Sequence, residues 1–165
     1  MQVCEVIKRV FTIGVYGKTE EQFFRRLTEA RIDTFCDVRH RRGVRAAQYA
    51  FANSQRLQKA LAARGIEYRH VLELAPSDDM RAAQYTLDAQ QGKRQRTREE
   101  LGEEFKERYC EEVLGKFDSA EFRRAFGSGS RFIVLFCVEA AAAACHRSLL
   151  AARLKKDWRV PIEHL

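Results

Sequence analysis

Several stretches of the chain carry the apolar pattern of β-strands, and helical patterns separate them. The longest apolar run covers residues 131–139 and is rich in aromatic and β-branched residues. A continuous run of this kind is typical of a strand buried on both faces of a sheet. Shorter runs predict strands at four other places, which are residues 6–13, 32–38, 66–74 and 160–163.

Between these stretches, apolar residues recur three or four positions apart, as on the buried face of a helix. The first such face, Phe23, Phe24 and Leu27, follows a capping-box pattern made by Thr19 and Gln22. Similar patterns predict helices over residues 53–64, 78–90 and 97–113, a helix after residue 118, and a last helix that opens at Cys145.

The charged segment 91–98 separates two of these helices, and we expect it to be a mobile linker. Thr97 is placed as the N-cap of the helix that follows, with Glu100 at the capping-box position three residues later.

Strands that alternate with helices predict an α/β fold. We expect a single domain over residues 1–165, with a three-layer, Rossmann-like architecture and a parallel or mixed sheet of about five strands. In such a sheet, the carboxyl ends of the strands lie at one edge, where α/β proteins bind ligands. Gly14, residues 37–40, residues 137–139 and the helix start at 145–147 should converge there.

The composition is that of a basic globular protein, with a formal charge of +7 and 22 Arg against 8 Lys. Arginine suits bidentate contacts with phosphate, so the partner we expect is a phosphate-bearing small molecule or a nucleic acid. A GC-rich genome would also enrich arginine. The chain lacks a membrane-length apolar run and a signal-peptide pattern, which predicts a cytoplasmic protein with no membrane partner.

A basic loop follows the second predicted strand. It holds four arginines and a histidine within seven residues. Because the loop begins at a strand end, we interpret it as the rim of an anion site, although a solvated basic loop would show the same composition. The predicted anion-binding residues are Arg39, Arg42 and Arg45 from this loop, together with His146 and Arg147 at the start of the last helix.

Cys145 is the leading candidate for a nucleophile. A thiol at a helix start beside His146 and Arg147 should have a lowered pKa. The alternative is a buried structural cysteine. The phosphatase spacing, in which five residues separate cysteine and arginine, is absent here: Cys145 and Arg147 are two apart, while Cys137 and Arg147 are ten apart.

Asp37 and Glu139 follow two predicted strands and could form a pair of catalytic carboxylates. The alternative is that each pairs with an arginine, with Arg39 or Arg147 as the partner of Asp37. Surrounded by arginines, Asp37 should be ionised and should anchor the site, whereas a general base needs a pKa near neutrality.

The cysteines and histidines do not show a recognised metal-binding spacing. The chain has five cysteines, and the eight-residue step from Cys137 to Cys145 is not that of a zinc knuckle. A site made of these two cysteines with His146 and His40 is conceivable, but the sequence predicts neither a metal nor a cofactor. Cys137 and Cys145 also leave open a redox-sensing thiol protein.

Together these residues resemble a known family. The pattern is Thr12 to Gly14 after the first strand, Asp37 to Arg39 after the second, Gly65 and Ile66 with Tyr68 before Glu73 and Leu74, and finally Cys137-x-Glu139 with Cys145-His146-Arg147. It resembles the DUF488 family of uncharacterised α/β proteins across nearly the whole chain. The resemblance implies a compact α/β fold, a bacterial or archaeal source and no settled activity. Many members carry a histidine directly after the first glycine, where this chain has Val15.

The hypotheses that remain are an enzyme acting on a phosphate-bearing or nucleotide-like ligand, a non-catalytic nucleic-acid-binding module built on residues 39–45 and 93–98, and a redox-sensing thiol protein. In the first hypothesis Cys145, Glu139 or Asp37 supplies the acid, base or nucleophile. The sequence does not choose among the three.

Overall fold

The computed structural model describes residues 7–165, so the start of the first expected strand, Val6, lies outside the described residues. A five-stranded sheet with the order β3-β2-β4-β1-β5 forms the centre, and all its strand pairs are parallel. The strands are β1 (Arg9–Ile13), β2 (Thr34–Asp37), β3 (Glu67–His70), β4 (Phe132–Phe136) and β5 (Ile162–His164). The predicted parallel sheet is confirmed, with strands shorter than the apolar runs.

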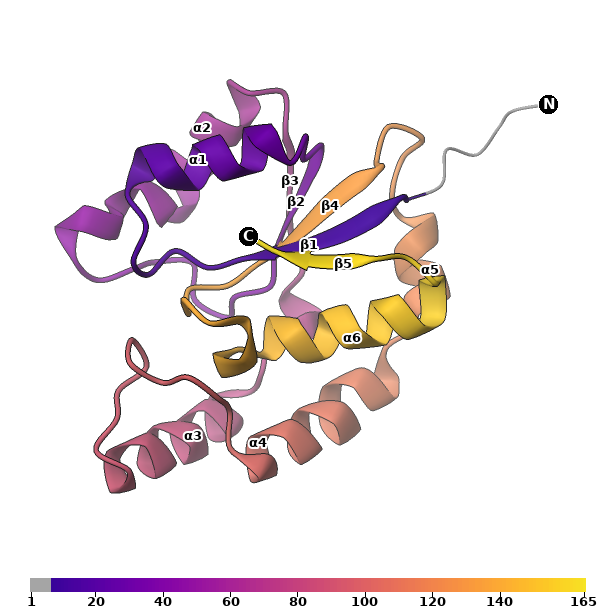
Figure 1. The fold of residues 1–165 in the computed structure, drawn as a ribbon. Coiled ribbons are helices and arrows are strands. Elements are labelled where there is room, and N and C mark those ends of the chain that lie inside the picture. The colour runs from indigo at the N-terminus through magenta and orange to yellow at the C-terminus, as the bar shows by residue number, and fades with distance from the viewer. Residues whose placement is uncertain (1–6) are drawn as a thin grey trace.

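Helices cover both faces of this sheet (Figure 1). On one face lie α1 (Glu20–Glu29) and α2 (Ser54–Ala62), and on the other lies α6 (His146–Trp158). Beyond α6 are α3 (Asp78–Gln90) and α4 (Glu103–Arg108), with α5 (Ser119–Arg124) after them in the chain. Short 3-10 helices occupy Ala47–Ala52, Leu72–Leu74, Leu114–Lys116 and Ala142–Ala144, and a π-helical turn covers Tyr109–Val113. The Rossmann-like three-layer architecture is therefore confirmed.

Aromatic packing joins α1 to the sheet. The ring of Phe23 on α1 meets Phe35 of β2 at 6.3 Å and Phe136 of β4 at 5.6 Å, measured between ring centroids. At the helix start, the Gln22 N–H donates to Thr19 Oγ1 at 3.2 Å and the Thr19 N–H donates to Gln22 Oε1 at 2.9 Å, which confirms the capping box. The capping box thus sets where α1 begins, and the aromatic contacts set how it packs on the sheet.

Among the described residues, no helix has both the length and the apolar character needed to cross a bilayer.

The register of the sheet brings the strand ends to one level. Phe136, the last residue of β4, pairs with Ile13 of β1 on one side and with Asp37 of β2 on the other. Asp37 pairs in turn with His70 of β3. The residues that follow these strands therefore emerge side by side at the carboxyl edge, as the sequence predicts.

The prediction that Thr97 caps a helix through residue 113 is wrong. The helix α4 begins at Glu103 with Gly102 as N-cap, and the π-helical turn follows it. Thr97 Oγ1 accepts from the Arg94 N–H at 3.0 Å and closes a turn. The reason is tertiary: the Leu101 N–H donates to the Ala143 carbonyl at 3.0 Å and the Gly102 N–H donates to Gln84 Oε1 at 2.9 Å, so the chain before Glu103 is bonded to other elements.

The segment 91–98 also differs from the mobile linker that its charges predict. Arg98 is only 7% exposed, and its guanidinium pairs with Asp88 at 2.6 Å and with Glu139 at 3.1 Å. Arg96 donates to the carbonyl of Arg45 at 2.9 Å. Glu139 and Arg45 lie 41 and 51 residues away in the sequence, so local composition could not reveal that the segment is fixed to the fold.

Gly14 allows the loop after β1 to contact the loop after β4. A Cβ at this position would lie 1.8 Å from the Glu139 carbonyl oxygen and 3.1 Å from Arg147 Nη2. The next two residues continue the contact, because the N–H groups of Val15 and Tyr16 both donate to the Val138 carbonyl, at 3.1 and 3.0 Å. Only glycine permits this close approach of two backbones.

Replacing Gly14 with alanine should therefore lower the free energy of unfolding by about 1–3 kcal/mol or more, because the new methyl group forces the two loops apart. The matched control is Gly127→Ala, where an added Cβ meets nothing within 4 Å, and which should change stability by no more than about 0.5 kcal/mol. Urea denaturation of both variants measures the difference, and equal midpoints would contradict the contact.

Candidate functional site

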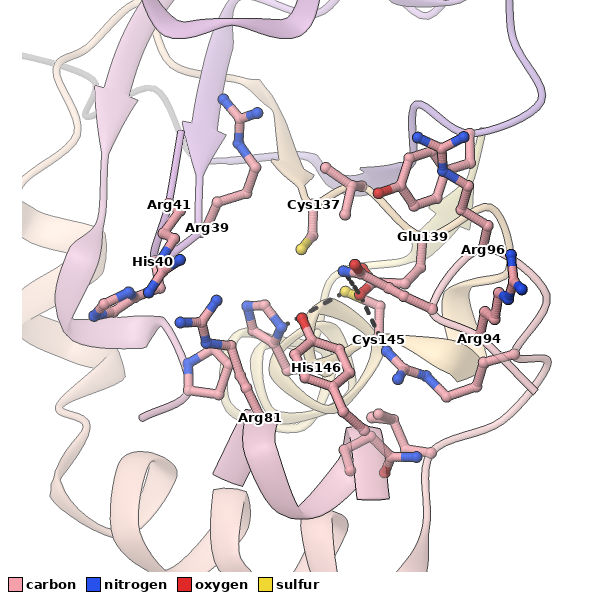
Figure 2. Close-up of a pocket in the computed structure, with 18 of the residues that line it drawn as sticks. Arg39, His40, Arg41, Arg81, Arg94, Arg96, Cys137, Glu139, Cys145 and His146 are labelled. Atoms are coloured by element: carbon pink, nitrogen blue, oxygen red, sulfur yellow. Dashed lines mark hydrogen bonds and ion pairs between the residues drawn. The ribbon is translucent and has the colours of Figure 1, made fainter. Parts of the chain in front are cut away.

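A cavity of about 900 Å³ opens at the carboxyl edge of the sheet (Figure 2). We call it the arginine cavity, because seven arginines line it: Arg39, Arg41, Arg45, Arg81, Arg94, Arg96 and Arg98. The acidic side chains of its lining are Asp78 and Glu139. The inner lining is the buried set Cys137, Glu139, Cys145 and His146, which we call the cavity floor.

Some of these arginines are already paired. Arg39, Arg81 and Arg98 each form an ion pair, Arg81 with Asp78 on its own helix. Within residues 7–165, no ion pair involves the other lining arginines at positions 41, 45, 94 and 96. The cavity therefore keeps an excess of positive charge available to an incoming anion.

The cavity floor brings together a thiol, an imidazole and a second thiol. Cys145 Sγ lies 3.6 Å from His146 Nδ1, and the ligand atoms of Cys137, Cys145 and His146 all lie within 4.8 Å of one another. His146 Nε2 lies 2.9 Å from the Val38 carbonyl oxygen. Because a carbonyl only accepts, Nε2 carries a hydrogen, and Nδ1 is left to face Cys145.

The pKa values of the two thiols of the floor are shifted in opposite directions. Burial raises the pKa of Cys145, but a hydrogen bond from Cys137 and the charges of His146 and Arg147 outweigh it and hold that pKa well below the usual range. The hydrogen bond to Cys145, together with burial, raises the pKa of Cys137 well above its usual range. Burial alone would lower the pKa of His146, yet the Cys145 thiolate raises it. The directions of these two pKa shifts favour a thiolate at Cys145 beside a protonated His146.

Glu139 connects the floor to the segment 91–98. Its Oε1 accepts from Gln95 Nε2 at 3.0 Å and from Arg98 Nη2 at 3.1 Å. Its Oε2 is buried and has no hydrogen-bond partner among the described residues. Burial, followed by the charge of Cys145, raises the pKa of this carboxyl. Glu139 is thus a carboxyl with one free oxygen beside a thiolate, which suits proton transfer.

Asp37 has a different position. Its two oxygens accept from Arg39 Nε at 2.8 Å and Arg39 Nη2 at 2.7 Å, and Oδ2 also accepts from the Tyr68 hydroxyl at 2.8 Å. Asp37 is completely buried and is not among the residues that line the cavity. Of the two partners left open by the sequence, the structure selects Arg39 and not Arg147. Asp37 and Glu139 therefore do not face each other in the cavity as a carboxylate pair.

The predicted anion-binding residues divide into two groups. Arg39, Arg45 and His146 line the cavity. Arg42 and Arg147 do not. Arg147 is 1% exposed, and its Nη2 donates to the Ala140 carbonyl at 3.3 Å. It acts on Cys145 by its charge and lies against the loop after β1.

Three residues of the site escape sequence reasoning. Arg81 lies on α3 and lines the cavity (Figure 2), and its helix carries no anion-site signal. Gln95 reaches Glu139 from a segment that looks like a linker. The ring of Tyr109 packs against the His146 ring at 5.3 Å between centroids. Only the tertiary fold reveals these three.

Comparison with known proteins identifies the family. The family model described as "Domain of unknown function DUF488" matches residues 19–154, which include the second strand, the arginine-rich loop and the cavity floor. No curated protein and no solved structure matches the chain. The chain belongs to the DUF488 family, as its motifs suggest.

Asp37→Asn should lower the free energy of unfolding by about 3–5 kcal/mol, because it leaves the buried Arg39 guanidinium without a counter-charge. Glu163→Gln is the matched control, since it removes the acid of an exposed pair with Arg9 and should cost no more than about 1 kcal/mol. Chemical denaturation measures both. If Asp37→Asn matched the parent in stability, Asp37 would not be an anchor.

In metal-free, reduced protein at neutral pH, iodoacetamide should modify Cys145 more than about tenfold faster than Cys36, because the thiolate is the reactive form. Cys36 is the matched control: it is equally buried, and burial raises its pKa to about 12. Because a lowered pKa keeps the thiolate populated at lower pH, Cys145 should also retain its rate on moderate acidification. Peptide mapping by mass spectrometry follows each site, and equal rates would contradict an ionised Cys145.

Proposed function

We propose that this member of the DUF488 family is an enzyme that binds a phosphate-bearing, nucleotide-like ligand in the arginine cavity and acts on it at the cavity floor. The observation that carries the proposal is that seven arginines surround a floor containing Cys145, His146 and Glu139. Binding groups and reactive groups thus share a single concave site, the arrangement expected of an active site.

Charge and shape support a phosphate as the anchoring group. Guanidinium groups bind phosphate oxygens in a bidentate manner, and four of the lining arginines have no ion pair within residues 7–165 to give up. The helix α6 begins at His146 with Cys145 as N-cap, and the Cys145 side chain makes no capping hydrogen bond. Its N-terminal amides and the positive end of its dipole favour an anion at the floor.

The aromatic side chains of the lining support a nucleotide-like ligand over a bare phosphate. Tyr16 and Tyr85 both line the cavity, and Tyr85 is 41% exposed. An exposed tyrosine ring offers a face on which a base can stack. The cavity volume of about 900 Å³ also lies within the range of small-molecule sites.

Within this proposal the candidate catalytic residues take separate roles. Cys145 lies where the ligand reacts, and Glu139 accepts or donates a proton through Oε2, the oxygen that has no partner among the described residues. Asp37 acts through Arg39 as a positioning residue, because its two oxygens are occupied. We therefore assign the chemistry to the floor and the binding to the surrounding arginines.

Arg81→Ala and Arg94→Ala should each weaken the binding of adenosine 5′-monophosphate by about 1.5–3 kcal/mol, the value of a hydrogen bond to a charged group. Arg25→Ala is the control, because Arg25 lies on α1, outside the cavity lining, and forms an exposed ion pair with Glu21. Isothermal titration calorimetry of the three variants, with inorganic phosphate and adenosine as further probes, separates the contributions of phosphate and base.

Equal binding by parent and cavity variants would contradict the proposal.

A nucleic acid is the second candidate partner, favoured because the basic segments 39–45 and 93–98 meet at the cavity, where Arg96 contacts the Arg45 carbonyl. A single-stranded oligonucleotide that binds without sequence preference, and whose affinity falls steeply with salt while the mononucleotide does not bind, would establish the non-catalytic binding module instead.

A further inference from the structure

We propose that Cys137, Cys145 and His146 bind one thiophilic divalent cation of the zinc type, with its fourth coordination position open to the arginine cavity. This inference deepens the proposed function, because it names the cofactor of the same site, and its use in a reaction rests on that function. The binding of the metal itself can be tested separately.

The sulfur–nitrogen pair of Cys145 and His146 has the spacing that tetrahedral zinc requires. Zinc–sulfur bonds of about 2.3 Å and zinc–nitrogen bonds of about 2.0 Å place a sulfur and a nitrogen ligand about 3.5 Å apart. Cys145 Sγ and His146 Nδ1 are 3.6 Å apart. Cys137 Sγ completes the set, since all three donor atoms lie within 4.8 Å of one another. Figure 2 shows the two sulfurs and the imidazole converging on the same point.

The imidazole is held in the orientation of a metal ligand. His146 Nε2 donates to the Val38 carbonyl at 2.9 Å, so Nδ1 faces Cys145, and its lone pair becomes available to a metal when metal binding releases the Nδ1 proton. Histidine ligands of metals commonly donate their other ring N–H to a backbone carbonyl or carboxylate. The Tyr109 ring packs on the imidazole and restricts its rotation.

The charges of the three donors alone would balance a dication. The three donors are 7%, 1% and 4% exposed, for Cys137, Cys145 and His146 respectively. Two thiolates and a neutral imidazole around a divalent cation have no net charge, which avoids the cost of burying an uncompensated ion. Thiolate and imidazole are also the ligand types that select zinc over magnesium or calcium.

Three protein ligands leave one position free, as in catalytic zinc sites. All three donors line the cavity, so the free position faces the arginines. Glu139 provides a second, independent indication of a bound group, because this residue is only 5% exposed, lies at the same floor, and has a buried Oε2 with no partner among the described residues. That oxygen can accept a hydrogen bond from a molecule that occupies the fourth position.

The spacing rule that argues against a metal in the sequence does not apply to this arrangement. Zinc knuckles take paired ligands from one short loop. Here Cys137 follows β4, whereas Cys145 and His146 open α6, and the intervening turn returns the chain to the same strand end. The ligands are therefore brought together by the α/β fold itself.

The first experiment uses the parent protein, reduced with a phosphine and freed of metal by a chelator. We expect one Zn²⁺ per chain by titration and elemental analysis, and Co²⁺ should give thiolate-to-metal charge-transfer absorption with the visible bands of a tetrahedral site. Zinc should also protect Cys137 and Cys145, but not Cys110, from alkylation. Binding of less than one zinc per chain, or a cobalt protein without thiolate-to-metal absorption, would overturn the site. Neither result requires a variant.

The second experiment compares single replacements. Cys137→Ser, Cys145→Ser and His146→Gln should each weaken zinc binding by about 100-fold or more, because even the loss of an outer-sphere partner costs 10–100-fold. The matched controls are Cys110→Ser, which removes an exposed thiol, and Cys36→Ser, which removes a buried thiol on β2. Circular dichroism checks the fold of each variant, and unchanged zinc affinity in folded ligand variants would overturn the assignment.

The third experiment tests the open position. Inorganic phosphate should shift the visible absorption of the cobalt protein, and Arg81→Ala should weaken that effect while leaving cobalt stoichiometry intact. A spectrum indifferent to phosphate would mean a closed, structural metal and would overturn the open fourth position. If the parent protein binds the nucleotide but no metal, this inference alone is refuted. If it binds the metal but no nucleotide, the proposed ligand alone is refuted.

Discussion

The site depends on the position of β4 between β1 and β2. Because β4 pairs in parallel with both neighbours, the three strands end at the same level, with Phe136 beside Ile13 and Asp37. Cys137 and Glu139 then leave the sheet where Gly14 permits the β1 loop to approach. A shift of β4 by one residue would exchange the faces of its side chains and separate Cys137 from the α6 start.

The surroundings of the floor are organised by compensation of buried charge. Arg98 reaches both Asp88 on α3 and Glu139 after β4, and in this way it connects the outer helices to the sheet. Arg39 is likewise held by Asp37 and lies 4.6 Å above the Phe136 ring. In a site of low dielectric such pairs fix the geometry of the remaining charges, among them the lining arginines that have no ion pair within residues 7–165.

The sequence predicts the parts of this molecule whose signals are local. The apolar run at 131–139 revealed the central strand, Thr19 and Gln22 revealed the start of α1, and strand ends revealed where the polar residues meet. It failed where a distant contact decides the outcome. Gly102 rather than Thr97 is the N-cap of α4, because the backbone N–H groups of Leu101 and Gly102 donate to Ala143 and Gln84. Arg81 and Gln95 join the site only because α3 and the segment after it return to the sheet. The proximity of Cys137, Cys145 and His146 is of the same kind, since no short spacing encodes it.

The order of the strands also affects how the chain reaches its fold. Strands β1 and β2 do not pair with each other. They are joined through β4, which lies between them and begins at Phe132. During synthesis most of the polypeptide must therefore emerge from the ribosome before the two halves of the sheet can join. Until then the apolar edges of β1 and β2 have no strand between them, a condition that favours association with other chains or with chaperones. A parallel sheet closed by contacts so distant in sequence is expected to form slowly for its size.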